Sequence, residues 1–312
     1  MAAYLIRRLW QMIPTLLGVV LLVFFLFKYV GNDPALILAG MNASPEQIES
    51  IREQLGLNKP VWEQLWIFIK QTVTFDWGVS WATRESIANL FSTRLPATLT
   101  VTLPILVLEV LLAIPFALAV ATVRGSLTDR LVMICSTVAV SISLLVYVIL
   151  AQYFFAFRLG WFPVQGWTGS TWTNLTTYAP LPVLIAVAVA LAPQIRLYRS
   201  FFLDELGHDY VRTARAKGMT EGTVLLKHVL RNAMIPILTN VAVSLPGIFV
   251  GAFLIEVFFS IPGLGRELLL AVNRGDYPVI QAFAIYLAAL TMTVNLGVDV
   301  LYKLADPRVV LK

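Results

Sequence analysis

The stretch Asp209-Tyr-Val-Arg-Thr-Ala-Arg-Ala-Lys-Gly218 separates two long apolar runs, and this alternation of apolar runs with charged connections decides the fold. The stretch contains good helix formers and ends at Gly218, a residue that helix C-termini favour. A second helical run begins at Thr220 and leads into the next apolar run. Its alanines let another surface come close, so the stretch is typical of a docking element. The alternative is an ordinary basic cytoplasmic loop.

The composition indicates a membrane protein. Of the 312 residues, 58% are hydrophobic and 13% are charged, about half the charged share of soluble proteins. The apolar residues collect into runs of about 20 or more, long enough to cross a hydrocarbon core of about 30 Å. Basic residues are not clustered with aromatic ones, so we expect no nucleic-acid partner. The single cysteine, Cys135, lies in an apolar run, which excludes an intramolecular disulfide and argues against a thiolate metal site.

The apolar runs predict an all-α polytopic fold with six membrane-spanning helices. We place them at Leu9–Val30, Pro96–Val123, Leu131–Phe157, Leu181–Tyr198, Ala233–Val257 and Tyr277–Tyr302. Prolines interrupt the second, fourth and fifth, which membrane helices tolerate when neighbours or water satisfy the freed carbonyls. Several kinked helices favour a bundle around a cavity, although harmless kinks explain each proline equally well. The first run exceeds the apolar core of a signal peptide and no small-x-small site follows it, so we expect a retained helix.

The distribution of cations predicts the orientation. With the N-terminus inside, the inside segments hold 14 of the 23 Lys and Arg residues and the outside segments hold eight, with Lys28 in the first run. This asymmetry favours cytoplasmic placement of both termini and of the charged loop.

The one sizeable segment between apolar runs, residues 31–95, is then extracytoplasmic. Ser44, Pro45 and Gln47 form a capping-box start, and Gly56 ends that helix. Apolar residues from Val61 to Val73 follow helical spacing and include two tryptophans, which predicts an amphipathic helix against membrane lipid at the outer interface. It is a platform or lid at the mouth of a pathway, or it merely shields the bundle.

The charged loop resembles the EAA loop of ABC-importer permeases of the dipeptide/oligopeptide/nickel branch. The matching residues are Tyr210, Ala214 to Gly218, Lys227, His228, Leu230 to Ala233 and Pro236. The likeness continues in order along nearly the whole chain. It includes Gly31 to Pro34, Leu55 to Leu57, Glu256 to Gly265, Asp276 to Gln281 and Asp306 to Arg308, with Asn32 where glycine is more usual.

The resemblance implies the type-1 importer permease fold, with a first helix (1–30), an extracytoplasmic helical segment (31–95), a five-helix domain (96–303) containing the coupling loop (200–232), and a cytoplasmic tail (304–312). It implies a multi-pass permease subunit in the bacterial inner membrane. The implied partners are a second permease, two ATPases that hold ATP and Mg, and an extracytoplasmic solute-binding protein. Di- or oligopeptides are the first expectation for the substrate, with glutathione, nickel chelates or another small solute as alternatives.

The same resemblance marks candidate sites. The ATPase-coupling residues are Tyr210, Arg212, Thr213, Ala214, Arg215, Ala216, Lys217, Gly218, His228, Arg231 and Asn232. The candidates for an outer gate are Pro262, Gly263 and Gly265.

Catalytic patterns are missing from the sequence. It contains no G-x-x-x-x-G-K-[ST], H-E-x-x-H or G-x-S-x-G motif and no Cys/His cluster with metal-ligand spacing. We therefore expect no catalytic residue, metal or cofactor in this chain, and ATP hydrolysis only in its partners. An ATP-independent secondary transporter is the rival, but the inverted halves that would favour it are not evident. A membrane-embedded enzyme would need clustered His, Asp or Glu, which the runs lack.

Glu109 is the one ionisable residue far from the ends of a predicted span. A charge at the bilayer centre costs roughly 3 kcal/mol or more, so Glu109 must face protein or water. It lines the substrate path, where it contacts a peptide amino group or another cation, or it pairs with a neighbouring helix. Gln152, Asn240 and Asn295 are weaker candidates for the same path.

Overall fold

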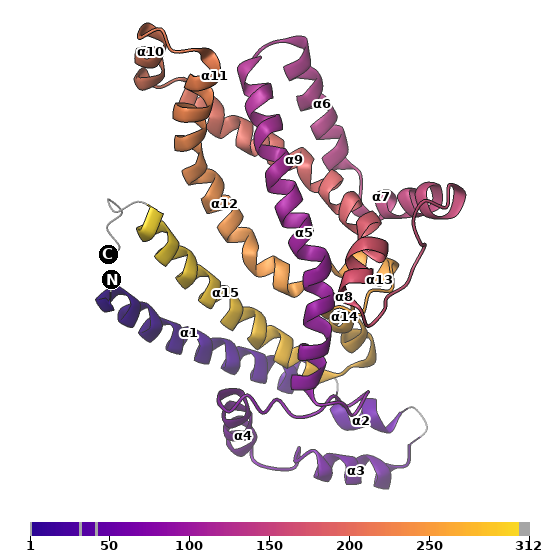
Figure 1. Ribbon diagram of the computed structural model, residues 1–312. Coiled ribbons are helices and arrows are strands. Elements are labelled where there is room, and N and C mark those ends of the chain that lie inside the picture. The colour runs from indigo at the N-terminus through magenta and orange to yellow at the C-terminus, as the bar shows by residue number, and fades with distance from the viewer. Residues whose placement is uncertain (1, 31–32, 41–42, 306–312) are drawn as a thin grey trace. The chain divides into compact units, whose positions relative to one another are not determined.

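The computed structural model describes residues 2–30, 33–40 and 43–305. Within these residues the regular secondary structure is helical, apart from one isolated β-bridge between Val79 and Ser86 (Figure 1). This confirms the predicted all-α class. The chain forms two compact units, Met1–Pro96 with Gly263–Lys312, and Ala97–Pro262.

The first unit contains the first and last long helices of the chain. Helices α1 (Ala2–Tyr29) and α15 (Tyr277–Ala305) pack along each other. The Tyr4 hydroxyl donates to Asp299 at 2.8 Å, and Arg8 lies 3.5 Å from the same carboxylate. The Ala2 end of α1 therefore lies beside the end of α15, so both ends of the described chain lie on one side of this unit.

The predicted extracytoplasmic segment folds into three short helices, α2 (Pro34–Ala39), α3 (Pro45–Gln54) and α4 (Val61–Val73). The capping box at Ser44 is confirmed, because its hydroxyl accepts from Gln47 N while the Gln47 side chain accepts from Ser44 N. The helix α4 is confirmed as well, with Trp62 and Trp66 exposed. The helix α2 was not expected; it begins at a proline after Asp33, whose side chain accepts from Ala35 N.

A buried carboxylate ties this segment to the start of α15. Asp276 accepts hydrogen bonds from Ser80 Oγ and from the backbone N–H groups of Trp81 and Ala82. Nearby, the start of α5 (Ile87–Thr122) packs on α14 (Leu264–Arg274) and α15 through an apolar cluster. The cluster consists of Ile87, Leu90, Leu264, Ala271, Val279, Ala282 and Phe283.

The second unit holds the rest of α5 and most of the remaining helices. In chain order they are α6 (Leu127–Ser141), α7 (Leu144–Ala151), the π-helical η1 (Gln152–Arg158), α8 (Thr171–Thr173), η2 (Asn174–Tyr178), α9 (Pro180–Leu206), α10 (Asp209–Ala216), α11 (Glu221–Thr223), η3 (Val224–Val229), α12 (Leu230–Val250) and α13 (Phe253–Phe258).

Two of the six predicted spans differ from continuous helices. Within the described residues, five helices are long and apolar enough to cross a membrane, and a sixth span results if α6 and the segment Leu144–Arg158 are counted together. These two are bent by 91° because Ser143 accepts from Leu145 N and so caps a new helix. The predicted fifth span is interrupted where α12 ends at Gly251, with φ of 92°.

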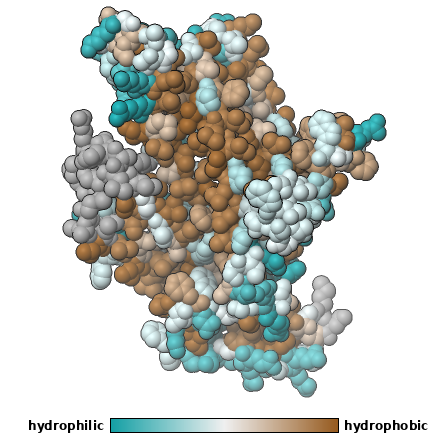
Figure 2. Space-filling view, viewed as in Figure 1, coloured by the Kyte–Doolittle hydropathy of each residue, from teal (hydrophilic) through white to brown (hydrophobic). Residues whose placement is uncertain are grey.

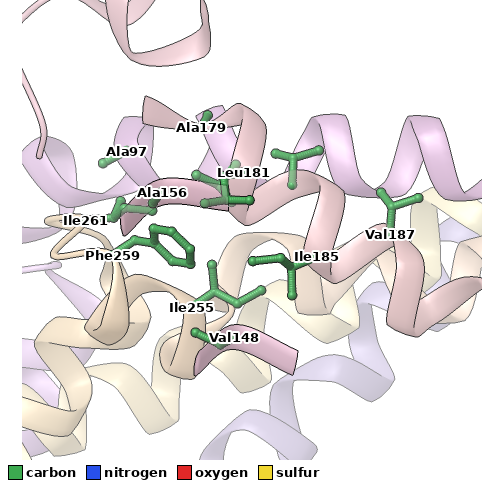
Figure 3. Packing of buried hydrophobic residues seen from close by; sticks show 12 residues of the cluster. Ala97, Val148, Ala156, Ala179, Leu181, Ile185, Val187, Ile255, Phe259 and Ile261 are labelled. Carbon is green, nitrogen blue, oxygen red and sulfur yellow. The ribbon is translucent and has the colours of Figure 1, made fainter. Parts of the chain in front are cut away.

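The two apolar cores of the second unit lie at different places along α9. Ile255, Phe259 and Ile261 gather with Leu181 and Ile185 of α9 (Figure 3). The other core includes Tyr198 and Phe202 and reaches the charged loop. In the second unit, the surface over α5 and α12 is apolar (brown in Figure 2), whereas α10 carries hydrophilic residues (teal). This is the distribution expected of membrane helices that end in a water-exposed loop.

Candidate functional site

The helix α10 has a buried face and a charged face. Val211 and Ala214 are buried against Tyr198 and Phe202 of α9 and against η3. Among the predicted coupling residues, Ala214 therefore packs inside its own unit rather than on a free surface. The exposed face carries Arg212, Thr213, Arg215, Ala216 and Lys217.

Gly218 ends α10 as predicted. Its φ is +78° and a Cβ there would meet no heavy atom within 4 Å, so glycine is favoured by backbone conformation and not by lack of space. The chain then returns through α11, where Glu221 accepts from Arg215 at 2.5 and 3.1 Å. This hydrogen bonding raises the pKa of the Arg215 guanidinium, which remains charged. The ion pair joins the end of α10 to the returning segment.

Tyr210 connects α10 to the long helices on either side of it. Its hydroxyl donates to Glu205 near the end of α9 and interacts with the side chain of Asn232 near the start of α12. Burial, together with the hydrogen bond to Glu205, raises the pKa of the Tyr210 hydroxyl. Tyr210 therefore contacts both α9 and α12. Figure 1 shows α10 and α11 beyond the ends of these two helices.

The remaining predicted coupling residues lie on the returning segment. Arg231 and Asn232 are exposed. His228 is half-buried, and its Nε2 is buried without a hydrogen-bond partner in the described part of the chain. The imidazole is therefore only partly available to a partner.

A largely buried ion pair, which sequence reasoning missed, joins α6 to α9. Arg199 donates to both oxygens of Asp129 at 2.7 Å, and Gly125 N donates to the same carboxylate at 2.8 Å. An acidic residue in the first turn of a helix is ordinary, so Asp129 carries no sequence signal that it pairs with a residue 70 positions later.

Several polar residues of the spans form a cluster in the second unit. Glu109 of α5 interacts with the side-chain amide of Gln194 on α9. Gln194 Nε2 donates to Asn240 Oδ1 of α12 at 3.1 Å, and the Tyr198 hydroxyl donates to the same oxygen at 3.3 Å. The structure thus brings the predicted Glu109 and Asn240 into one group. Gln194 was missed, although a glutamine after Pro193 in an apolar run was an available signal.

The other two path candidates lie elsewhere. Gln152 donates to the carbonyls of Val164 and Phe258 at 3.3 and 3.1 Å, which anchors a loop. Asn295 belongs to the first unit, where it lines a small cavity of about 190 Å³ between α1 and α15.

The candidate gate residues occupy a packed turn. Gly263 immediately precedes α14, and Gly265 is buried in its first turn. Pro262 is half-buried. The turn follows the fully buried Glu256, which accepts from Thr98 at 2.9 Å. The boundary between the two compact units falls within this turn, between Pro262 and Gly263.

Comparisons with known proteins match nearly the whole length of the chain. Residues 113–311 match the family described as the binding-protein-dependent transport system inner membrane component, and residues 1–102 match the N-terminal region of such membrane components. The chain is 37% identical over 309 residues to the glutathione transport system permease protein GsiC of Escherichia coli K12, and the match covers 99% of each. It is 33% identical over 332 residues to the dipeptide transport system permease protein DppB of Alkalihalophilus pseudofirmus, again with 99% of each covered.

These matches cover nearly the whole of a chain that has long apolar helices and a cationic loop between α9 and α12. The chain belongs to the inner-membrane permeases of binding-protein-dependent ABC importers, in their dipeptide/oligopeptide family.

Proposed function

We propose that the chain forms, with a second and similar permease, the path by which short peptides cross the bacterial inner membrane. Two ATPase subunits on the cytoplasmic side drive the transport, and an extracytoplasmic binding protein delivers the substrate. The observation that supports this most is the two-faced helix α10. Its buried face is fixed to α9 and η3, and its exposed face presents cations and a small residue to a partner.

The coupling in this proposal is mechanical. When ATP closes the ATPase dimer, the exposed face of α10 moves with it. The hydroxyl of Tyr210 passes the displacement to α9 through Glu205 and to α12 through Asn232. The pair of Asp129 and Arg199 adds α6 to the same moving body. No side chain of this chain takes part in hydrolysis, and ATP and Mg are held by the ATPases.

Peptides are the proposed substrate class because similar permeases are named for glutathione and for dipeptide transport. Both are amides with a free amino group and a free carboxylate. Within this class we favour di- and oligopeptides, with glutathione as the second candidate because a 37% identical relative carries its name. Both termini and α10 lie in the cytoplasm in this proposal, as the excess of cations in these segments favours.

The test is uptake by the complete importer in liposomes, with its binding protein and ATP on the appropriate sides. Alanyl-alanine and reduced glutathione serve as labelled probes. We expect ATP-dependent uptake of at least one of them, and loss of uptake when this chain is left out. Absence of ATP-dependent uptake of both probes contradicts the proposal.

A further inference from the structure

The cluster formed by Glu109, Gln194, Tyr198 and Asn240 lies far from the ends of three membrane helices. In α5, Glu109 is flanked by Leu103 to Leu108 on one side and by Val110 to Ile114 on the other, a stretch whose only other interruption is Pro104. Gln194 and Asn240 lie near the middle of α9 and α12. Polar groups at this depth are costly unless they find partners, so their convergence calls for an explanation.

The hydrogen bonds within the cluster leave much of its capacity unused. A carboxylate has about four acceptor positions, and Glu109 interacts with one amide, that of Gln194. Asn240 accepts two hydrogen bonds through Oδ1, whereas its Nδ2 donates none to the described part of the chain. The cluster therefore offers open acceptors on Glu109 beside open donors on Asn240.

The charge of Glu109 is also uncompensated within the chain. It forms no ion pair with any cation among the described residues. Arg196 is the cation closest to Gln194 along α9, but two residues correspond to about 200° around a helix, and Arg196 is exposed. A purely structural cluster would pair the carboxylate with a cation or with several donors.

We propose that Glu109, Gln194 and Asn240 form a recognition site for the ammonium group of the substrate and for the peptide bond next to it. The Glu109 carboxylate accepts from the ammonium group. The Asn240 amide donates to the adjacent carbonyl oxygen, and Gln194 holds these two side chains at a fixed spacing. Side-chain amides and a carboxylate on half-exposed residues match the backbone of a peptide and ignore its side chains, which suits a permease that takes more than one sequence. The inference rests on the proposed peptide function.

The experiment measures uptake of alanyl-alanine by the complete importer in liposomes. Reduced glutathione serves only as a probe of the proposed function, because its ammonium group lies beside a carboxylate and not beside a peptide bond. Glu109→Gln keeps the size of the side chain and its contact with Gln194 but removes the charge. We expect initial uptake to fall about 10- to 100-fold, the loss of one charge-assisted hydrogen bond. The yield of assembled complex is measured for each variant, and uptake is expressed per complex. Thr239→Val is the matched control, because Thr239 is exposed beside Asn240 and bonds the carbonyl of Ile235 in its own helix.

A second variant separates recognition from structure. Asn240→Asp keeps an acceptor oxygen for Gln194 and Tyr198 but removes the Nδ2 donor. We expect initial uptake of alanyl-alanine to fall while the complex still assembles, and unchanged uptake would overturn the donor role of Asn240. Normal uptake by Glu109→Gln overturns the inference, as does a loss explained entirely by a lower yield of complex, which would assign Glu109 to contact with the second permease. Uptake of glutathione alone by the unmodified importer overturns the inference but not the proposed function, whereas uptake of neither probe overturns both.

Discussion

Two alanines of α10, two positions apart, should respond in opposite ways to the same substitution. Ala214 is 5% exposed and lies in the cluster with Val211, Tyr198 and Phe202, whereas Ala216 is exposed. Inserting a bulky side chain into a packed core costs typically about 1–3 kcal/mol, and a change on an exposed helix face stays within about 0.5 kcal/mol. Ala214→Trp should therefore lower the thermal stability of the complex, and Ala216→Trp should not.

Docking of the ATPase, in contrast, should be impaired by Ala216→Trp. In the docked state, the tryptophan of Ala216→Trp must be accommodated between α10 and the ATPase. If that contact is packed as tightly as a protein core, the same 1–3 kcal/mol corresponds to roughly 5- to 150-fold weaker docking. The assays are thermal denaturation of the purified complex, co-purification of the ATPases, and ATP-driven peptide uptake. Ala88→Trp is the matched control, since Ala88 is an exposed alanine of α5 in the other unit.

Full co-purification and uptake by Ala216→Trp would show that the exposed face of α10 is not a docking surface. An unchanged thermal stability of Ala214→Trp would show that Ala214 is not buried in the folded loop.

Three further predictions concern parts of the structure away from α10. Asp129→Asn should destabilise the complex by about 3 kcal/mol, since it leaves the largely buried Arg199 without its charged partner; a loss below about 1 kcal/mol in denaturation experiments would contradict a stabilising role of this ion pair. Asp276→Ala leaves a hydroxyl and two backbone N–H groups without their acceptor, so proteolysis should cut the segment before α5 faster than in the unmodified protein. Equal rates of cleavage would show that these hydrogen bonds do not hold the segment in place. A cysteine replacing Glu46 should react with a membrane-impermeant thiol reagent in intact cells, and one replacing Arg130 only after the inner membrane is opened; reversed labelling would overturn the proposed topology.

The sequence predicts those features of the fold that depend on local chemistry. Hydropathy over about 20 residues locates the spans, the Ser44 capping box locates α3, and a glycine at positive φ ends α10 at Gly218. The bend between α6 and α7 was not predicted, because a short Ser-Ile-Ser segment inside an apolar run does not reveal which serine caps a new helix.

The features that depend on how helices face one another could not be predicted. The burial of Ala214 follows from the packing of α10 on α9. The sequence of the eight residues of α10 does not reveal this packing. Sequence reasoning selected Glu109 and Asn240 because polar residues in apolar runs need partners. It could not show that Gln194 connects them, since that requires the relative rotation of α5, α9 and α12.

The most direct test of the central claim, that α10 docks on the ATPase, is site-specific cross-linking of the exposed face. With the exposed Cys135 first replaced by serine, Ala216→Cys is treated with a short thiol cross-linker in the assembled importer whose ATPase carries a cysteine in the surface that faces the membrane. We expect a cross-linked product between this chain and the ATPase whose yield changes when ATP is bound and hydrolysed, with none from Ala88→Cys. A product that is absent from Ala216→Cys, or that forms equally from Ala88→Cys, would contradict the account.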